Sequence, residues 1–164
     1  GYLGEKVTAQ NLKIILNSLA VTFDYTLIDC PAGIEAGFKR AVSAADRAIV
    51  VTTPHISAIR DANKVATLLS SYKFSPTLIV NRVRGDLLAA GKIPSPSDIS
   101  ELLKIELIGV VKETDGVYNL DGVPRKPFDL IAHKIMYGTG EIYDPSAEFR
   151  GVFGAIKRRM KRNV

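Results

Sequence analysis

The residue of this chain best suited to chemistry is an aspartate that directly follows a short apolar run. Residues 25–28 form the run, Asp29 ends it, and Pro31 and Gly33 follow within four positions. In parallel α/β sheets, ligands bind beyond the carboxyl ends of the strands, where an aspartate can orient Mg²⁺ and a glycine loop can face a phosphate. The same pattern also fits an ordinary strand followed by a polar turn, and the aspartate by itself does not distinguish the two.

Two more apolar runs end in polar side chains. Residues 48–51 lead into Thr52 and Thr53, and residues 77–80 lead into Asn81 and Arg82. Continuous apolar runs of this length are typical of parallel strands that are covered on both faces. Because parallel strands end at one edge of a sheet, we expect these polar ends to converge there.

Helical patterns between the runs supply the elements that would hold such a sheet. Apolar spacing and capping residues predict helices over residues 8–20, 36–45, 57–71 and 95–104, and a fourth strand over residues 107–111. Thr8 and Ser57 are the expected N-caps of the first and third of these helices. Alternating strands and helices predict the α/β class, with a parallel sheet and flanking helices. Residues 113–145 show no regular pattern, and residues 123–127 are expected to be loop.

Length and composition fit one soluble globular domain. The 164 residues are 46% hydrophobic and 24% charged, and no apolar run approaches the roughly 20 residues needed to span a bilayer. The single cysteine, Cys30, cannot form an internal disulfide, which favours a reducing compartment. Of the net charge of +5, residues 149–164 carry six positive and no negative charges, so the rest of the chain has 5 − 6 = −1. Basic character therefore belongs to the tail, and nucleic acid binding by the body is not favoured.

Four segments in order resemble the MinD branch of the MinD/ParA ATPases. Residues 24–35 (DYTLIDCPAGIE) resemble that family's Walker B and switch II segment, and residues 45–62 resemble its next strand and helix. Residues 80–83 (VNRV) and the weaker match at residues 108–127 follow in the family's order. The resemblance covers about residues 7–127 and implies a partial P-loop NTPase fold.

The resemblance implies roles for five residues in binding ATP and Mg²⁺. Asp29 would hold Mg²⁺ through water, and the backbone around Ala32 and Gly33 would face the γ-phosphate, which makes Asp29 and Gly33 the candidate catalytic residues. Asn81 and Arg82 would lie near the adenine. The alternative for Asn81 is an ordinary turn residue.

The resemblance also implies partners and a location. Arg60 and Asp61 lie on the helix that serves this family for dimer formation and MinC binding, although a solvated helix face explains them as well. The implied function is an ATPase switch in division-site placement that dimerises with ATP and meets MinC-like and MinE-like regulators. The implied location is the cytoplasm, at the inner face of an anionic cell membrane.

Part of the family pattern is missing from these residues. No G-x-x-x-x-G-K-[ST] phosphate loop or deviant form occurs, so residues 1–164 are interpreted as the C-terminal part of one ATPase domain, from Walker B onward. Without the loop, this piece alone is predicted to be inactive, since phosphoryl transfer depends on holding the phosphates. Lys112 replaces an expected proline, residues 125–127 replace Gly-Glu-Pro, and residues 128–143 show no clear counterpart.

The tail is predicted to form an amphipathic basic helix over residues 146–162. Its apolar stripe is Phe149, Val152, Phe153, Ile156 and Met160. The helix can pack on the body or lie on an anionic membrane, and the first arrangement is favoured.

Two other functions stay open. One is a chromosome-partitioning or flagellar-number ATPase of the same superfamily, and the other is a non-catalytic binding module. A phosphate loop in sequence upstream of residue 1 would favour an ATPase.

Overall fold

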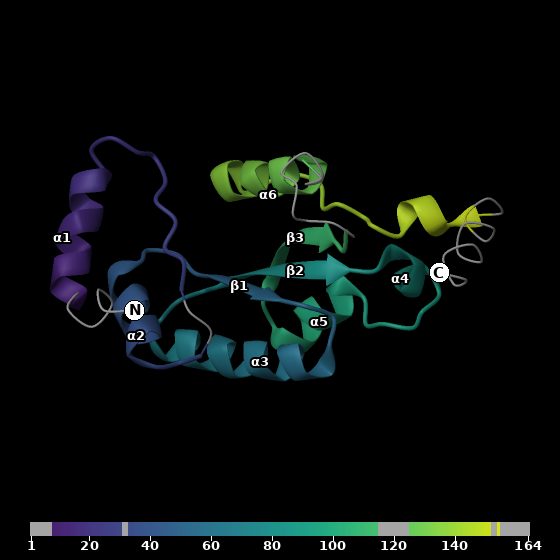
Figure 1. Cartoon of the computed structure of the whole chain (residues 1–164), viewed down its shortest axis with the longest axis horizontal. Coiled ribbons are helices and arrows are strands. Elements are labelled where there is room, and N and C mark those ends of the chain that lie inside the picture. The colour runs from purple at the N-terminus through teal and green to yellow at the C-terminus, as the bar shows by residue number, and fades with distance from the viewer. Residues whose placement is uncertain (1–7, 31–32, 115–124, 152–153, 155–164) are drawn as a thin grey trace. The chain divides into compact units, whose positions relative to one another are not determined.

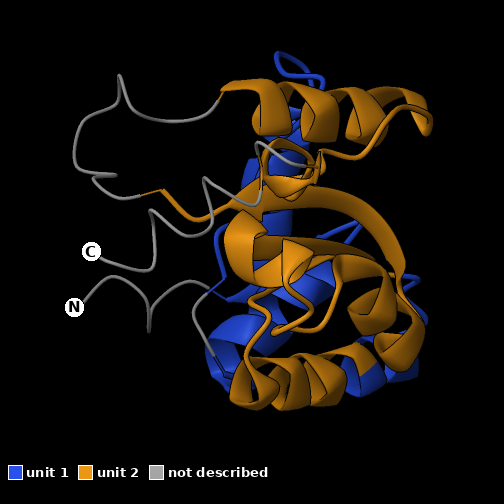
Figure 2. Cartoon of the chain, turned by 90° about the vertical axis from the view of Figure 1, so that its right-hand side faces the viewer, with its two compact units in different colours: residues 1–48, 67–75 blue, residues 49–66, 76–164 orange. Residues whose placement is uncertain are grey.

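The computed structural model describes residues 8–30, 33–114, 125–151 and 154, which fall into two compact units. Unit 1 comprises residues 1–48 and 67–75, and unit 2 comprises residues 49–66 and 76–164 (Figure 2). Each unit is described by itself below.

Unit 2 is built on a parallel sheet of three strands in the order β1-β2-β3 (Figure 1). The strands are β1 (Ile49–Thr52), β2 (Thr77–Val83) and β3 (Glu106–Lys112). Thr52 at the end of β1 lies opposite Val80, directly before Asn81 of β2. The predicted parallel sheet is confirmed, and the polar ends of β1 and β2 share one edge.

Helices flank this sheet on both faces. In Figure 1, α6 (Arg125–Tyr137) lies on one side, and α3 (Ile56–Ser71) and α5 (Pro96–Leu103) lie on the other. Gly109 of β3 allows α6 to approach closely, because a methyl group there would overlap the Ile131 side chain. The core gathers where β2 and β3 meet these helices, and its fully buried side chains include Leu78, Val80, Val83, Ile99 and Val110.

Helix α5 begins at a capping box formed by Ser95 and Asp98. Ser95 accepts a hydrogen bond from the Asp98 amide at 3.0 Å, and the Asp98 carboxylate accepts one from the Ser95 amide at 3.0 Å. This capping box satisfies amides that have no partner within the helix, and Pro96 at the first position has no amide to satisfy. The predicted helix is confirmed, and it places Ile99 in the core.

Two helices of unit 2 are missing from the sequence-based expectations. Helix α4 (Gly85–Ala89) follows β2, and α6 occupies a region expected to be irregular, beginning at Arg125 within the expected loop. Pro127 lies in the first turn of α6, where a missing amide costs no hydrogen bond. Helix α3 begins at Ile56, so Ser57 lies inside its first turn and is not the predicted cap.

The segment after α6 contains η2, a 3₁₀ helix at Ala147–Phe149, which packs against α4. Asp144 Oδ1 accepts hydrogen bonds from the Ser146 amide at 2.8 Å and from its hydroxyl at 2.6 Å. Gly85, at the start of α4, packs directly under Pro145 and the Phe149 ring. Most of the predicted tail helix over residues 146–162 lies outside the described residues and stays a prediction.

Unit 1 contains α1 (Ala9–Leu19) and α2 (Ala36–Ala44), which pack on each other. Thr8 caps α1 as predicted, by accepting a hydrogen bond from the Asn11 amide at 3.1 Å. Phe38 and Val42 of α2 are buried.

The predicted strand over residues 25–28 is wrong: this segment has no strand geometry in the structure. A strand needs a neighbour for its backbone amides and carbonyls, and the described sheet contains only β1, β2 and β3. Tyr25 and Leu27 are exposed accordingly, with Leu27 at 85%.

Candidate functional site

The carboxyl end of β2 carries an irregularity that sets Asn81 and Arg82 apart from the regular strand. The register between β2 and β3 shifts between Val80 and Val83, so Asn81 and Arg82 have no regular partners on β3. Arg82 has φ = 57°, a left-handed conformation that is uncommon for a residue with a side chain. Outliers of this kind concentrate at functional sites, which draws attention to this strand end.

Hydrogen bonds fix both residues. The Arg82 amide donates to Asn81 Oδ1 at 2.8 Å, and the Arg82 side chain donates to Glu113 Oε1 from Nε at 3.3 Å and from Nη2 at 3.1 Å. In the described part of the chain, the NH₂ group of the Asn81 amide has no partner. A pair of hydrogen-bond donors at the carboxyl end of a strand suits an acceptor atom of a bound ligand.

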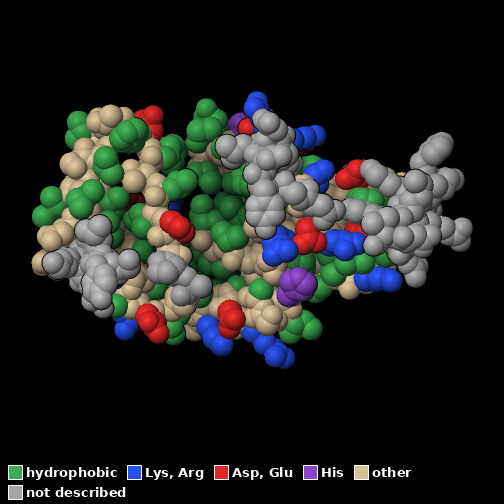
Figure 3. All heavy atoms as spheres, in the orientation of Figure 1, with side chains coloured by type: hydrophobic (Ala, Val, Ile, Leu, Met, Phe, Trp, Pro, Cys, Tyr) green, Lys and Arg blue, Asp and Glu red, His purple; other side chains and the backbone are tan. Residues whose placement is uncertain are grey.

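Charged side chains gather around this strand end, where Figure 3 shows Lys, Arg, Asp and Glu side chains beyond the sheet. Lys112, which ends β3, lies 3.9 Å from Glu148 Oε1. Arg84 donates from Nε and Nη2 to the two carboxylate oxygens of Asp86 at 3.0 and 2.7 Å. Each of these basic side chains is paired with an acidic one, so this strand end carries both signs of charge.

Asp29 and Gly33 belong to unit 1, whereas Asn81 and Arg82 belong to unit 2. Asp29 is exposed, and Gly33 has φ = +103°, a conformation that glycine adopts far more readily than other residues. Ala32 lies outside the described residues. Within unit 2, the structure places Asn81 beside Arg82 at the end of β2.

Cys30 follows Asp29 and is the free cysteine of this segment. Partial desolvation and the neighbouring Asp29 carboxylate both raise the pKa of its thiol. A raised pKa keeps the thiol protonated at neutral pH, so little of the reactive thiolate form is present.

The described residues contain no group of three or more His, Cys, Asp or Glu side chains that could hold a metal ion. Mg²⁺ commonly binds through one or two carboxylates together with water and substrate phosphates. An exposed carboxylate such as Asp29 fits that mode of binding.

The two predicted partner-binding residues lie side by side on α3. Asp61 pairs with Lys64 at 2.9 Å on the same helix, with both side chains about 70% exposed. Figure 3 shows acidic and basic side chains next to one another along this helix.

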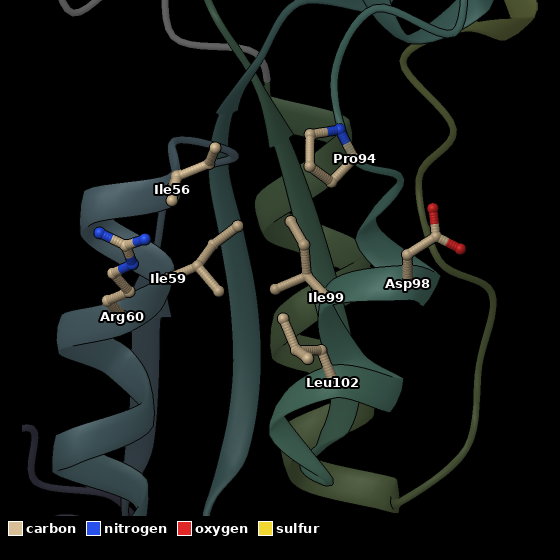
Figure 4. Close-up of a pocket in the computed structure, with 7 residues that line it drawn as sticks. All are labelled: Ile56, Ile59, Arg60, Pro94, Asp98, Ile99 and Leu102. Atoms are coloured by element: carbon tan, nitrogen blue, oxygen red, sulfur yellow. The ribbon is translucent and has the colours of Figure 1, made fainter.

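Arg60 lines a hollow of about 260 Å³ between α3 and α5. Figure 4 shows Ile59 of α3 and Ile99 of α5 directed toward each other across it, while Asp98 points away. The remaining lining side chains are apolar: Ile56, Pro94 and Leu102. An exposed arginine beside an apolar hollow is suited to a protein partner.

Comparison with known proteins identifies the relatives of this chain. It is 46% identical to the septum site-determining protein MinD of Bacillus subtilis over 113 residues, which are 68% of this chain and 42% of that protein. It is also 42% identical to a putative septum site-determining protein MinD of Nephroselmis olivacea over 167 residues, covering 93% of this chain and 60% of that protein. The chain belongs to the MinD family.

Solved MinD structures share the fold. MinD of Aquifex aeolicus superposes with a TM-score of 0.76 at 30% identity, over 84% of this chain and 64% of that one. A MinC:MinD complex from Aquifex aeolicus gives 0.74 at 32% identity, over 82% and 61%. MinD of Pyrococcus horikoshii, complexed with Mg-ADP, gives 0.65 at 25% identity, over 79% and 57%. The predicted P-loop NTPase fold of the MinD type is confirmed.

No family model matches the chain. The match to the Nephroselmis MinD extends beyond residues 7–127, so the resemblance covers more of the chain than the four segments predicted. None of the described helices, over residues 8–30, 33–114 and 125–151, is long and apolar enough to cross a membrane.

Sequence reasoning about this MinD relative missed Glu113. The residue follows β3 and contacts Arg82 across 31 positions of sequence. No local pattern indicates such a contact.

The Arg84–Asp86 pair gives a pH dependence that can be measured. The hydrogen bonds from Arg84 hold the pKa of the buried Asp86 carboxyl below its usual range. This pKa lies below the unfolded-state value of about 4, so the carboxylate stabilises the fold above that pH. The contribution is lost as the pH falls through the folded-state pKa.

We therefore expect Asp86→Asn to flatten the acid side of the stability profile. Denaturant midpoints measured between about pH 5 and pH 2 should fall less steeply in the variant than in the wild type. The matched control is Asp129→Asn on the exposed side of α6. Equal slopes for wild type and Asp86→Asn would contradict the expectation.

Proposed function

We propose that this chain supplies the Walker B and base-binding part of an ATP-driven switch in division-site placement. The observation that carries the proposal is the 46% identity with the septum site-determining MinD of Bacillus subtilis over 113 residues. The chain spans 42% of that protein, so the activity is proposed for the complete ATPase domain and not for these residues alone.

Nucleotide-binding roles are proposed for five residues. Asp29 would hold Mg²⁺ through water, and the backbone around Ala32 and Gly33 would face the γ-phosphate. Asn81 and Arg82 would take the adenine. Bound Mg²⁺ would supply charge stabilisation for phosphoryl transfer. The Mg-ADP in the Pyrococcus horikoshii MinD supports this choice of cofactor.

Partners are proposed on α3. The MinC:MinD complex from Aquifex aeolicus supports a MinC-like partner for the surface around Arg60 and Asp61. ATP-dependent dimerisation, a MinE-like regulator and recruitment to the inner face of the cell membrane complete the proposed switch.

A chimaera tests this function directly. Bacillus subtilis MinD that carries this chain in place of its own matching segment should hydrolyse MgATP and co-sediment with MinC. Arg60→Glu should weaken MinC binding about tenfold or more, because interface arginines are frequent hot spots. Lys39→Glu on α2 is a charge-reversal control. A folded chimaera that neither hydrolyses ATP nor binds MinC would refute the proposal.

A further inference from the structure

The hollow between α3 and α5 is apolar at its base and at its rim. Ile59 of α3 and Ile99 of α5 are buried and lie at the base, directed toward each other (Figure 4). Ile56 and Leu102 lie at the rim and are 66% and 68% exposed. The hollow measures about 260 Å³. A water molecule needs only about 15 Å³ of such space, so a whole side chain can enter.

Helical spacing brings these side chains to one surface. Ile56, Ile59 and Arg60 stand at positions i, i+3 and i+4 of α3, so they share one face of that helix. Ile99 and Leu102 stand at positions i and i+3 of α5 and share a face in the same way. A partner that enters the hollow therefore contacts two helices, and not α3 alone.

Arg60 brings a positive charge to this apolar surface. The acidic residue next to it, Asp61, pairs with Lys64 at 2.9 Å. The Asp98 carboxylate accepts the Ser95 amide at 3.0 Å and points away from the hollow. In residues 8–30, 33–114 and 125–151, no acidic side chain forms an ion pair with Arg60. The surface is therefore complementary to a negative charge beside an apolar group.

A protein partner fits this surface better than a small ligand does. Small-molecule sites orient their ligand through several convergent polar groups, whereas here Asp98 points away and the lining side chains other than Arg60 are apolar. Interface hot spots, in contrast, combine an apolar side chain in a pocket with a neighbouring arginine. The MinC:MinD complex from Aquifex aeolicus supports a MinC-like protein as the source of that side chain.

We propose that the hollow is a docking point of the MinC-like partner: one aliphatic side chain of the partner enters between α3 and α5, and a carboxylate beside it pairs with Arg60. This rests on the proposed function. It extends the proposed partner surface from Arg60 and Asp61 to α5, and it makes Leu102 a residue that contacts the partner.

Binding of Bacillus subtilis MinC to the chimaera in MgATP tests the contribution of α5. Leu102→Glu should raise the Kd about tenfold, the effect of losing an apolar anchor from an interface. The matched control is Met136→Glu on α6, which replaces another exposed apolar side chain and should leave the Kd unchanged. Unchanged MinC binding by Leu102→Glu would overturn the inference. So would a loss of chimaera self-association in place of MinC binding, because the hollow would then be a contact between two copies.

Methyl NMR of the full 164-residue chain tests the chemistry without MinC. The probes are acetyl-Leu-Asp-amide and acetyl-Leu-Asn-amide, which have the same shape and differ in the carboxylate. Both should shift the methyl resonances of Ile59 and Ile99, and the aspartyl peptide should bind about threefold more tightly, as expected for an exposed ion pair. Arg60→Gln should abolish this preference. Equal affinities of the two peptides for the wild type, or methyl resonances that do not shift, would overturn the inference.

The two experiments separate the inference from the proposed function. A folded wild-type chimaera that does not bind MinC would refute the proposed function, and with it a MinC-like source of the aliphatic side chain. The peptide titrations would still decide whether the hollow selects an aliphatic side chain beside a carboxylate.

Discussion

Replacing Asp29 with alanine is expected to lower MgATP turnover of the chimaera by roughly a thousandfold, about 4 kcal/mol of transition-state stabilisation. In the proposed site this carboxylate is the residue of the chain that holds Mg²⁺. Within residues 24–35, Asp29 alone is assigned to Mg²⁺. We therefore expect no other side chain to compensate for the loss of its carboxylate. The measurement is steady-state phosphate release at saturating Mg²⁺.

Two controls make this result specific. Asp24→Ala removes an exposed carboxylate from the same segment and should leave turnover close to that of the parent. The 164-residue chain without the remainder of a MinD should show no turnover at all. Magnesium-dependent ATP hydrolysis by the chain alone, lost on Asp29→Ala, would refute the view that these residues hold only part of the site.

The second large effect concerns stability. Gly85→Ala is expected to reduce the free energy of unfolding by about 1–3 kcal/mol, the usual cost of overpacking a filled core. A methyl group at this position would overlap the Pro145 backbone, including its carbonyl oxygen, and approach the Phe149 ring closely. Backbone atoms cannot move aside as a flexible side chain does, so η2 would be displaced from α4.

Denaturant unfolding followed by circular dichroism measures this loss. Gly91→Asn is the matched control, since Gly91 has φ = +63°, nothing lies within 4 Å of a Cβ there, and asparagine tolerates left-handed backbone. A Gly85→Ala midpoint equal to that of the wild type would contradict this prediction. It would show that the segment over residues 144–149 can move to accommodate the methyl group without loss of stability.

The sheet was predictable from sequence because its strands are continuous apolar runs. Strands that are covered on both faces need apolar side chains at successive positions, as in the strands of Leu78 and Val110. This requirement can be read from the strand itself, without knowledge of the neighbouring elements. The same rule failed over residues 25–28, where an equally apolar run has no strand beside it in the described sheet. Apolar composition is a local property, whereas pairing is not.

Helix α6 and Glu113 were beyond sequence reasoning for a similar reason. Prolines near Arg125 indicate a loop, and only the fit of Ile131 over Gly109 explains why a helix packs there. The contact between Glu113 and Arg82 joins residues that are far apart in the chain. The place of Asn81 near the end of a strand, in contrast, could be predicted because a polar residue after an apolar run is visible in the sequence.

Gly33 limits what ordinary mutagenesis can reveal about its proposed place beside the γ-phosphate. At φ = +103°, any L-amino acid is strained even though nothing lies within 4 Å of an added Cβ. A loss of turnover in Gly33→Ala could therefore have two causes. One is backbone strain at the positive φ, and the other is steric overlap between the added methyl group and a bound phosphate. D-Alanine, introduced by semisynthesis, accepts this φ without strain, so turnover that is restored in the D-alanine variant would assign the loss in Gly33→Ala to the backbone conformation.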